Sequence, residues 1–315
     1  MINRIQVIIL KKVYFNVINF IQNIRGIIFF IGLALNTIFW FLPIIVCAMA
    51  KILLPFFIVK QTTANILMKI GENWVSVNSC LIKYVGSVHI KCNNNNRLKR
   101  DGWYLVVANH QTWVDILILQ TVFNRKIPLL KFFIKQELMW FPLLGIAFWA
   151  LDMPYMKRFS PSYLSKNPHK KGEDLKMTKR SCEKFRDTPT SVFNFLEGTR
   201  FSEAKHANKK SPYKNLLQPK AGGIAIVLSS MGNLFNSLID VTLAYPNKDF
   251  SFWDLCCGKD IEVVVDIREI ELESWLIDND YENDRIFRKE LHLWLGDLWK
   301  EKDENIANIL KSYNK

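Results

Sequence analysis

The longest feature of the hydrophobic pattern is an apolar run near the amino terminus. Residues 26–50 carry no charge, and a helix of that length would reach about 37 Å, enough to cross the core of a bilayer. The long lead-in, the length of the run and the lack of a small-residue cleavage site argue against a cleaved signal peptide. The remaining alternative to a membrane segment is a buried core helix.

How this segment meets a membrane depends on its interruptions and its flanks. Pro43 and Pro55 interrupt the apolar sequence, and basic residues flank both of its ends. A single span would place one basic flank on the unfavoured side, so a re-entrant hairpin or a tilted helix is favoured over a span. Residues 1–24 show the mixed pattern of an interfacial amphipathic helix. We therefore predict an amino-terminal membrane anchor over residues 1–60.

After residue 60 the pattern changes to short apolar strands separated by helices. We predict strands at 84–94, 104–108, 129–134, 192–196, 239–244 and 261–267, helices at 62–83, 112–122, 173–186, 221–230 and 283–299, and exposed loops at 166–171 and 202–216. Strands without strict alternation, separated by helices, are typical of a sheet that is buried on both faces. The expected fold class is therefore α/β, with a single sheet covered by helices on both faces, in one domain over residues 61–315.

Composition and charge narrow the class of protein. The chain is 50% hydrophobic and 23% charged, which excludes a disordered protein, and its net charge of +13 favours a polyanionic partner such as nucleic acid or an anionic membrane. The excess of basic residues lies before residue 221, because residues 221–315 are net acidic. Nucleic-acid binding would leave the apolar run unexplained. Six cysteines without a CxxC pair or metal-ligand spacing indicate free thiols in a reducing compartment.

The first candidate for chemistry lies at the end of a predicted strand. Residues 104–108 lead into Asn109 and His110, and Asp115 follows five residues after the histidine. On a regular helix these two side chains would point about 140° apart, so they can meet only if His110 precedes the helix and folds over its first turn. Asp115 would then fix the imidazole tautomer and leave the other ring nitrogen free as a general base. The same spacing at His169 and His292 lacks a strand-end context, and a structural role for His110 is the alternative.

A second polar cluster follows another predicted strand. Glu197, Gly198, Thr199 and Arg200 come directly after the strand at 192–196. Glycine lets the backbone approach a ligand closely, and arginine suits a phosphate, although a surface ion pair that closes a loop would look the same. Further pieces of the pattern are the segment 135–145, the adjacent pair Lys157 and Arg158, and the segment 218–223.

Together, and in this order, these blocks resemble the PlsC-like family of 1-acylglycerol-3-phosphate O-acyltransferases. The family motif NHxxxxD is matched by Asn109, His110 and Asp115, and the motif FPEGTR by residues 195–200, with Leu196 where many members have proline. The second and fourth regions are matched by 135–145 with 156–158, and by 241–246. Leu196, and Phe201 directly after Arg200, look closer to the motif of a family branch with members that act on varied lysophospholipids.

The resemblance implies a glycerol-3-phosphate acyltransferase-like fold and an O-acyltransferase. His110, held by Asp115, would deprotonate the sn-2 hydroxyl of 1-acylglycerol-3-phosphate as it attacks an acyl thioester of coenzyme A or acyl carrier protein, giving phosphatidic acid in phospholipid synthesis. The acceptor and its phosphate would be bound by a group of six residues, namely Lys157, Arg158, Glu197, Gly198, Thr199 and Arg200. No metal and no cofactor beyond the acyl donor are expected.

The resemblance also sets the expected partners and location. These are a lysophospholipid, an acyl thioester, membrane lipids and, as donor, acyl carrier protein, without specific nucleic acid. The Asn, Ile and Lys bias points to an AT-rich bacterial genome, and with it to an inner membrane with the site facing the cytoplasm. Two alternatives stay open: an acyltransferase on a head-grouped lysophospholipid, and a catalytically idle membrane scaffold.

Overall fold

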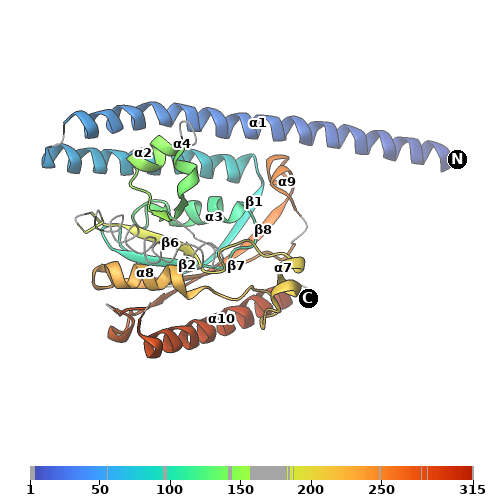
Figure 1. Ribbon diagram of the computed structural model, residues 1–315. Coiled ribbons are helices and arrows are strands. Elements are labelled where there is room, and N and C mark those ends of the chain that lie inside the picture. The colour runs from blue at the N-terminus through green and yellow to red at the C-terminus, as the bar shows by residue number, and fades with distance from the viewer. Residues whose placement is uncertain are drawn as a thin grey trace.

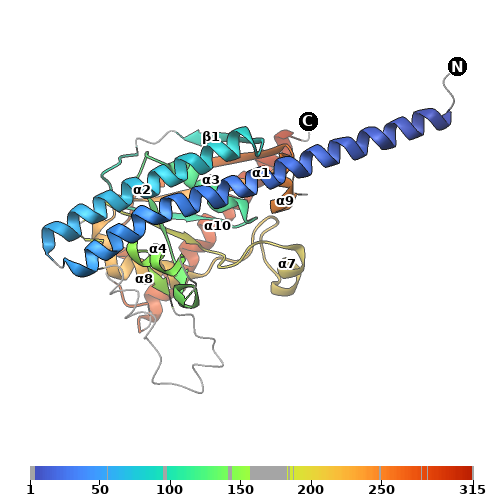
Figure 2. The same ribbon diagram turned by 90° about the horizontal axis from the view of Figure 1, so that it is seen from above.

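The amino-terminal part of the chain forms a long helical hairpin. The computed structural model describes residues 4–54, 56–94, 98–140, 144–156, 183, 185–186, 188–247, 250–277, 279–281 and 283–313. Helix α1 (Arg4–Leu53) is followed by α2 (Phe57–Tyr84), which runs back along it (Figure 1). The hairpin lies on the α/β layer, and the amino-terminal part of α1 projects beyond the rest of the molecule (Figure 2).

The remaining elements build one large sheet and a small one. The strands of the large sheet are β1 (Val88–Asn94), β2 (Tyr104–Ala108), β3 (Leu130–Phe132), β6 (Ser191–Phe195), β7 (Ser237–Ala244) and β8 (Ile261–Ile270). Their order is β1-β8-β7-β2-β6-β3; β7, β2, β6 and β3 are mutually parallel, and β8 is antiparallel to β7. The small sheet pairs β4 (Ile134–Lys135) with β5 (Tyr155–Met156).

Helices cover both faces of the large sheet. The described helices after α2 are α3 (Val114–Phe123), η1 (Gln136–Trp140), α4 (Leu144–Ala150), α7 (Glu203–Lys209), α8 (Ala221–Met231), η3 (Gly232–Leu234), α9 (Phe252–Cys256), η4 (Ser274–Leu276) and α10 (Arg285–Tyr313). The hairpin, α3 and α9 lie on one face, and α8 and α10 lie on the other (Figure 1). Every residue of β2 and β7 is buried, as expected for central strands between two helical layers. The predicted fold class is therefore confirmed.

The helix α1 differs from the prediction in its continuity. Residues 1–24 were expected as a separate amphipathic helix, and Pro43 was expected to interrupt the apolar run. Instead, α1 joins both segments and passes through this proline without ending. A proline inside a helix removes one backbone hydrogen bond and crowds the carbonyl four residues earlier. The neighbouring Ile44 and Ala48 are buried against α2 and α4. This packing stabilises the helix across the interruption.

Several other boundaries shift. The segment 202–216, expected as a loop, contains α7, which begins where the Ser202 hydroxyl accepts a hydrogen bond from the Lys205 backbone. Tyr84 ends α2 instead of opening β1, and the strand predicted at 129–134 divides into β3 and β4. The helix predicted at 173–186 and the loop at 166–171 lie almost entirely outside the described residues. The predicted division at residue 60 falls inside α2 and stays a prediction.

Candidate active site

The loop after β2 is anchored through Asn109. This side chain is fully buried, and its amide donates to the Leu243 carbonyl at 2.9 Å and accepts from the Leu243 backbone N–H at 2.8 Å. A buried amide that satisfies both functions on one residue fixes the loop against β7. The strand end of β2 therefore has a defined position relative to its neighbour, and His110 follows directly.

His110 and Asp115 meet as the sequence predicted. The distance from His110 Nδ1 to Asp115 Oδ2 is 2.8 Å, and the same oxygen accepts from the backbone N–H groups of Gln111 at 2.6 Å and Thr112 at 2.9 Å. Asp115 is fully buried in the first turn of α3. With Nδ1–H donating to this carboxylate, the other ring nitrogen, Nε2, carries the lone pair that a general base needs.

A second contact to Asp115 was not predicted. Tyr245, buried at the end of β7, donates its hydroxyl hydrogen to Asp115 Oδ1 at 2.6 Å. Burial and the nearby Asp115 charge raise the pKa of Tyr245 well above its usual range, so the phenol remains a donor. The only sequence signal for this residue was its place in the matched segment 241–246.

The imidazole of His110 borders a cavity of about 220 Å³. Its ring stacks on Phe195 with a centroid separation of 3.8 Å. The cavity is lined by His110, Trp113, Phe132, Phe133, Phe193, Asn194, Phe195, Gly198, Thr199 and Arg200. It combines aromatic walls with one base and one cation, a lining suited to an amphipathic ligand that carries an anionic group.

Glu197 is not among the residues that line this cavity. The side chain is fully buried, and its two carboxyl oxygens accept from the backbone N–H of His110 at 3.2 Å and of Leu217 at 3.3 Å. Burial raises the pKa of Glu197 to about 8, an effect that the Asp115 charge increases and the two backbone hydrogen bonds reduce. Its contacts are those of a group that positions the His110 backbone, and its predicted part in acceptor binding stays a prediction.

The turn after β6 brings cations to the rim of the cavity. Gly198 adopts φ +66°, a left-handed conformation that glycine takes without strain. Arg200 stacks over the Trp113 ring at 3.9 Å. Lys205 Nζ donates to Thr199 Oγ1 at 3.0 Å. Lys220 Nζ is also close to this turn, because a Cβ added at Gly198 would be 3.2 Å from it.

Lys205 and Lys220 were not among the six residues predicted to bind the acceptor. Lys157 and Arg158 lie outside the described residues. Lys205 was missed because its segment was expected as a loop, although Ser202 followed by Glu203 is a helix-start signal. Lys220 belongs to the segment 218–223 that the sequence already marked.

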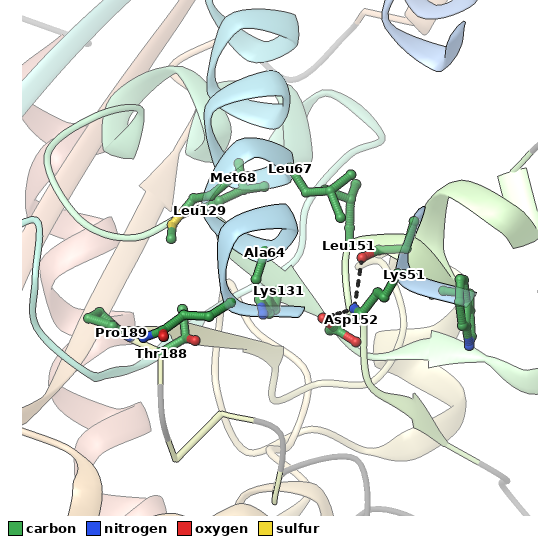
Figure 3. Close-up of a pocket in the computed structure, with 13 residues that line it drawn as sticks. Lys51, Ala64, Leu67, Met68, Leu129, Lys131, Leu151, Asp152, Thr188 and Pro189 are labelled. Carbon is green, nitrogen blue, oxygen red and sulfur yellow. Dashed lines mark hydrogen bonds and ion pairs between the residues drawn. The ribbon is translucent and has the colours of Figure 1, made fainter. Parts of the chain in front are cut away.

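A larger cavity, of about 430 Å³, lies away from this site. It is bordered by Lys51 of α1, by α2, and by the segments that precede β3 and β6 (Figure 3). Lys51 and Asp152 form an ion pair there at 2.7 Å (Figure 3). None of the predicted site residues that the structure describes lines this cavity, so the smaller cavity beside His110 is the candidate active site.

Part of the chain matches a family of known proteins. The sequence model of the family described as Acyltransferase matches residues 89–245, a range that contains both halves of the site. The human protein "1-acyl-sn-glycerol-3-phosphate acyltransferase delta" is 28% identical over 244 residues, which cover 73% of this chain and 57% of the relative. The chain therefore contains an acyltransferase-family domain over residues 89–245.

Other acyltransferases are comparably distant. The human "1-acyl-sn-glycerol-3-phosphate acyltransferase gamma" is 28% identical over 212 residues, covering 63% of this chain and 51% of the relative. The chain thus spans about half the length of the curated relatives it matches. The crystal structure of the 1-acyl-sn-glycerophosphate (LPA) acyltransferase PlsC from Thermotoga maritima has the same fold, with a TM-score of 0.51, 14% identity, and coverage of 91% of this chain and 98% of that one.

Proposed function

We propose that this protein is a 1-acylglycerol-3-phosphate O-acyltransferase, which moves a fatty acyl group from an acyl thioester to the sn-2 hydroxyl of its acceptor and produces phosphatidate. The observation that carries the proposal is the pairing of His110 with buried Asp115, which leaves the imidazole bordering a cavity with Arg200 at its rim. The matched family and the names of the relatives support the same reaction class.

The proposed chemistry uses the free nitrogen of His110. Nε2 takes the proton of the acceptor hydroxyl as its oxygen forms a bond to the thioester carbonyl carbon. The tetrahedral intermediate then expels the thiolate. The thiolate takes the proton from the imidazolium, so the products are the ester and the free thiol. Asp115 stabilises the transient positive charge on the ring. Coenzyme A and acyl carrier protein both supply such a thioester.

The acceptor phosphate would bind on the cationic rim. Arg200 presents a planar fork that can donate two hydrogen bonds to phosphate oxygens, and the aromatic face of Trp113 orients the guanidinium. By the family resemblance, Lys157 and Arg158 would add charge at the same place. The aromatic walls would take the apolar part of the lipid.

The outer face of α1 supports a location on a membrane. Exposed apolar side chains follow each other at helical spacing along its length: Val13, Val17, Phe20, Ile24, Ile27, Ile31, Leu35, Ile38, Leu42, Val46, Met49 and Leu53. This helix is also long and apolar enough to cross a bilayer.

The opposite face of α1 argues against a perpendicular span. Arg25 donates to Ser87 at 2.7 Å and Lys51 pairs with Asp152 at 2.7 Å, so the helix is attached to the α/β layer at two points about 39 Å apart along its axis. A perpendicular span would draw that layer into the hydrocarbon core. We infer that α1 lies along the membrane with its outer face immersed, on the cytoplasmic side if the protein is bacterial.

The decisive experiment compares acyl transfer by the wild type and by His110→Ala. Membranes that contain either chain receive long-chain acyl-coenzyme A or, as a second donor, acylated acyl carrier protein. The acceptor is labelled lysophosphatidate or a labelled head-grouped lysophospholipid. His292→Ala is the matched control, because this histidine also precedes an aspartate by five residues but lies on α10.

We expect the wild type and the control to form phosphatidate, and His110→Ala to form it at least about 100-fold more slowly. Equal product from all three chains would remove His110 as the base. If the wild type preferred a head-grouped lysophospholipid, the proposed acceptor would be wrong but the acyl-transfer chemistry would stand. If no product formed with any donor, the protein would be a catalytically idle scaffold.

A further inference from the structure

The carboxyl-terminal helix α10 lies outside the matched range 89–245 but contacts a segment that reaches the active site. Residues 211–217, here named the bridging segment, pass between them. The Asp303 carboxylate accepts from the backbone N–H of Lys214 at 2.8 Å and of Asn215 at 2.7 Å. Fully buried Trp299 donates its indole N–H to the Leu217 carbonyl at 3.0 Å. The bridging segment is therefore attached to α10 by directional bonds in its middle and at its last residue.

The other side of the bridging segment contacts the catalytic loop. The Leu217 N–H donates to the Glu197 carboxyl group, whose second oxygen accepts from the His110 N–H. The side-chain amide of Gln111 donates to the Asn215 carbonyl at 3.2 Å. The segment therefore contacts the catalytic loop directly at Asn215 and through Glu197 at Leu217.

The bridging segment depends on these bonds because it forms no helix or strand. Backbone N–H groups in irregular segments need side-chain or water partners when they are shielded from solvent. Trp299 and Asp303 are four residues apart and lie on one face of α10. On the same face, buried Lys302 donates to the Val241 carbonyl of β7 at 2.7 Å, so α10 also contacts the strand that Tyr245 directly follows.

We propose that Trp299 and Asp303 are positioning residues for acyl transfer. They fix the bridging segment, which through Leu217 and Asn215 fixes Glu197 and the backbone at His110. Neither side chain lines the cavity, so they act on the geometry of the base and not on substrate contact. This inference rests on the proposed function for its kinetic test.

The kinetic test uses substitutions that keep size and remove hydrogen bonds. Trp299→Phe removes the indole donor, and Asp303→Asn leaves only one acceptor oxygen for two backbone N–H groups. We expect each to lower kcat about 3- to 10-fold, with the acceptor KM within about twofold of the wild type. The matched controls are Trp294→Phe and Glu304→Gln, neighbours on α10 whose side chains form no hydrogen bond with the bridging segment among the described residues. Both should retain the wild-type kcat.

A double-mutant cycle separates positioning from a general loss of stability. If Trp299 acts through Glu197, combining Trp299→Phe with Glu197→Gln should lower kcat no more than about twofold beyond Glu197→Gln alone. Losses that multiply, or a Trp299→Phe variant with the kcat of the wild type and an unchanged melting temperature, would overturn the proposal.

A substrate-free measurement keeps this inference distinct from the proposed function. Modification of His110 by diethyl pyrocarbonate, followed by peptide mass spectrometry, reports the accessibility of its ring. We expect Trp299→Phe and Asp303→Asn to change this rate at least about threefold, because a loosened loop opens more often, while exposed His292 reacts as in the wild type. Unchanged His110 reactivity in both variants would contradict the positioning role even if the wild type transferred no acyl group.

Discussion

Asp115 and Tyr245 share a buried hydrogen bond of 2.6 Å, and Tyr245 is the only described side chain that donates to Asp115 Oδ1. The other carboxylate oxygen already serves His110 and two backbone N–H groups. Tyr245 therefore restrains rotation of the carboxylate that orients the base. The pairing joins residues separated by 130 positions in the chain, so no local pattern could predict it, whereas the short spacing of His110 and Asp115 could be read directly.

Tyr245→Phe should lower kcat about 3- to 10-fold and leave the acceptor KM unchanged, because it removes one hydrogen bond from the positioning of the base and none from the cavity. Tyr104→Phe is the matched control. Tyr104 is also buried on the sheet, and its hydroxyl accepts from the Lys99 N–H, but it starts β2 at the end away from His110. Steady-state kinetics of both variants provide the measurement, and equal rates for the two would refute a specific role of Tyr245.

Glu197 gives a pH-dependent prediction. Its pKa is raised to about 8 in the folded chain, so folding favours the protonated acid. The stabilisation from this group is fully present below its unfolded pKa, near 4.5, and is lost as the pH rises through about 8.

Glu197→Gln should therefore flatten the fall in melting temperature between pH 5 and pH 9, because glutamine cannot ionise. Glu203→Gln, an exposed change in the first turn of α7, should reproduce the wild-type curve. Thermal unfolding across that pH range tests both. Parallel curves for the wild type and Glu197→Gln would show that Glu197 has an ordinary pKa in the folded chain.

At the scale of elements, the turn between β6 and α7 depends on one glycine. Alanine at Gly198 would occupy the left-handed region at a cost of about 1–2 kcal/mol, and its Cβ would stand 3.2 Å from Lys220 Nζ. We expect Gly198→Ala to lower the melting temperature and to reduce acyl transfer, since the turn carries Thr199 and Arg200.

The matched control for this turn is Gly222→Ala. Gly222 lies in the first turn of α8, and no atom stands within 4 Å of an added Cβ. This change should be neutral or stabilising, by up to about 1 kcal/mol. The measurement is the melting temperature of each variant together with its rate; a Gly198→Ala chain as stable and active as the control would mean that the turn tolerates a right-handed backbone.

The sequence predicted those elements whose own residues form a recognisable local pattern. Apolar strands that end in polar clusters predicted the central strands β2 and β6 and the loops that follow them. The continuity of α1 through Pro43 depends on burial of Ile44 and Ala48 against other helices, which no local pattern reveals. In the same way, Glu197 looks like a surface residue beside Arg200, and its burial follows from Leu217, twenty residues later.

At the scale of the molecule, charge and shape both favour the orientation on a membrane that we propose. The apolar outer face of α1 lies on one side of the sheet and α10 on the other (Figure 1). Residues before 221 are net basic and those from 221 to 315 are net acidic. An anionic bilayer attracts the first group and repels the second, so the electrostatic field would turn the hairpin toward the membrane and α10 away from it.

Lysine substitutions on the outer face of α1 test this orientation. Each of Leu35 and Leu42 is more than half exposed, so neither change should disturb the core. Burying a leucine side chain is worth about 1.5–3 kcal/mol and a lysine within the bilayer costs a similar amount, so the double variant Leu35→Lys/Leu42→Lys should bind vesicles at least about 100-fold more weakly than the wild type. Co-sedimentation with vesicles of mixed zwitterionic and anionic lipids gives the partition coefficient. Ile286→Lys, at a position near the start of α10 that is also more than half exposed, should bind slightly more tightly than the wild type through its added charge. If Ile286→Lys instead weakened binding as much as the double variant, the α10 side would face the membrane and the orientation would be reversed.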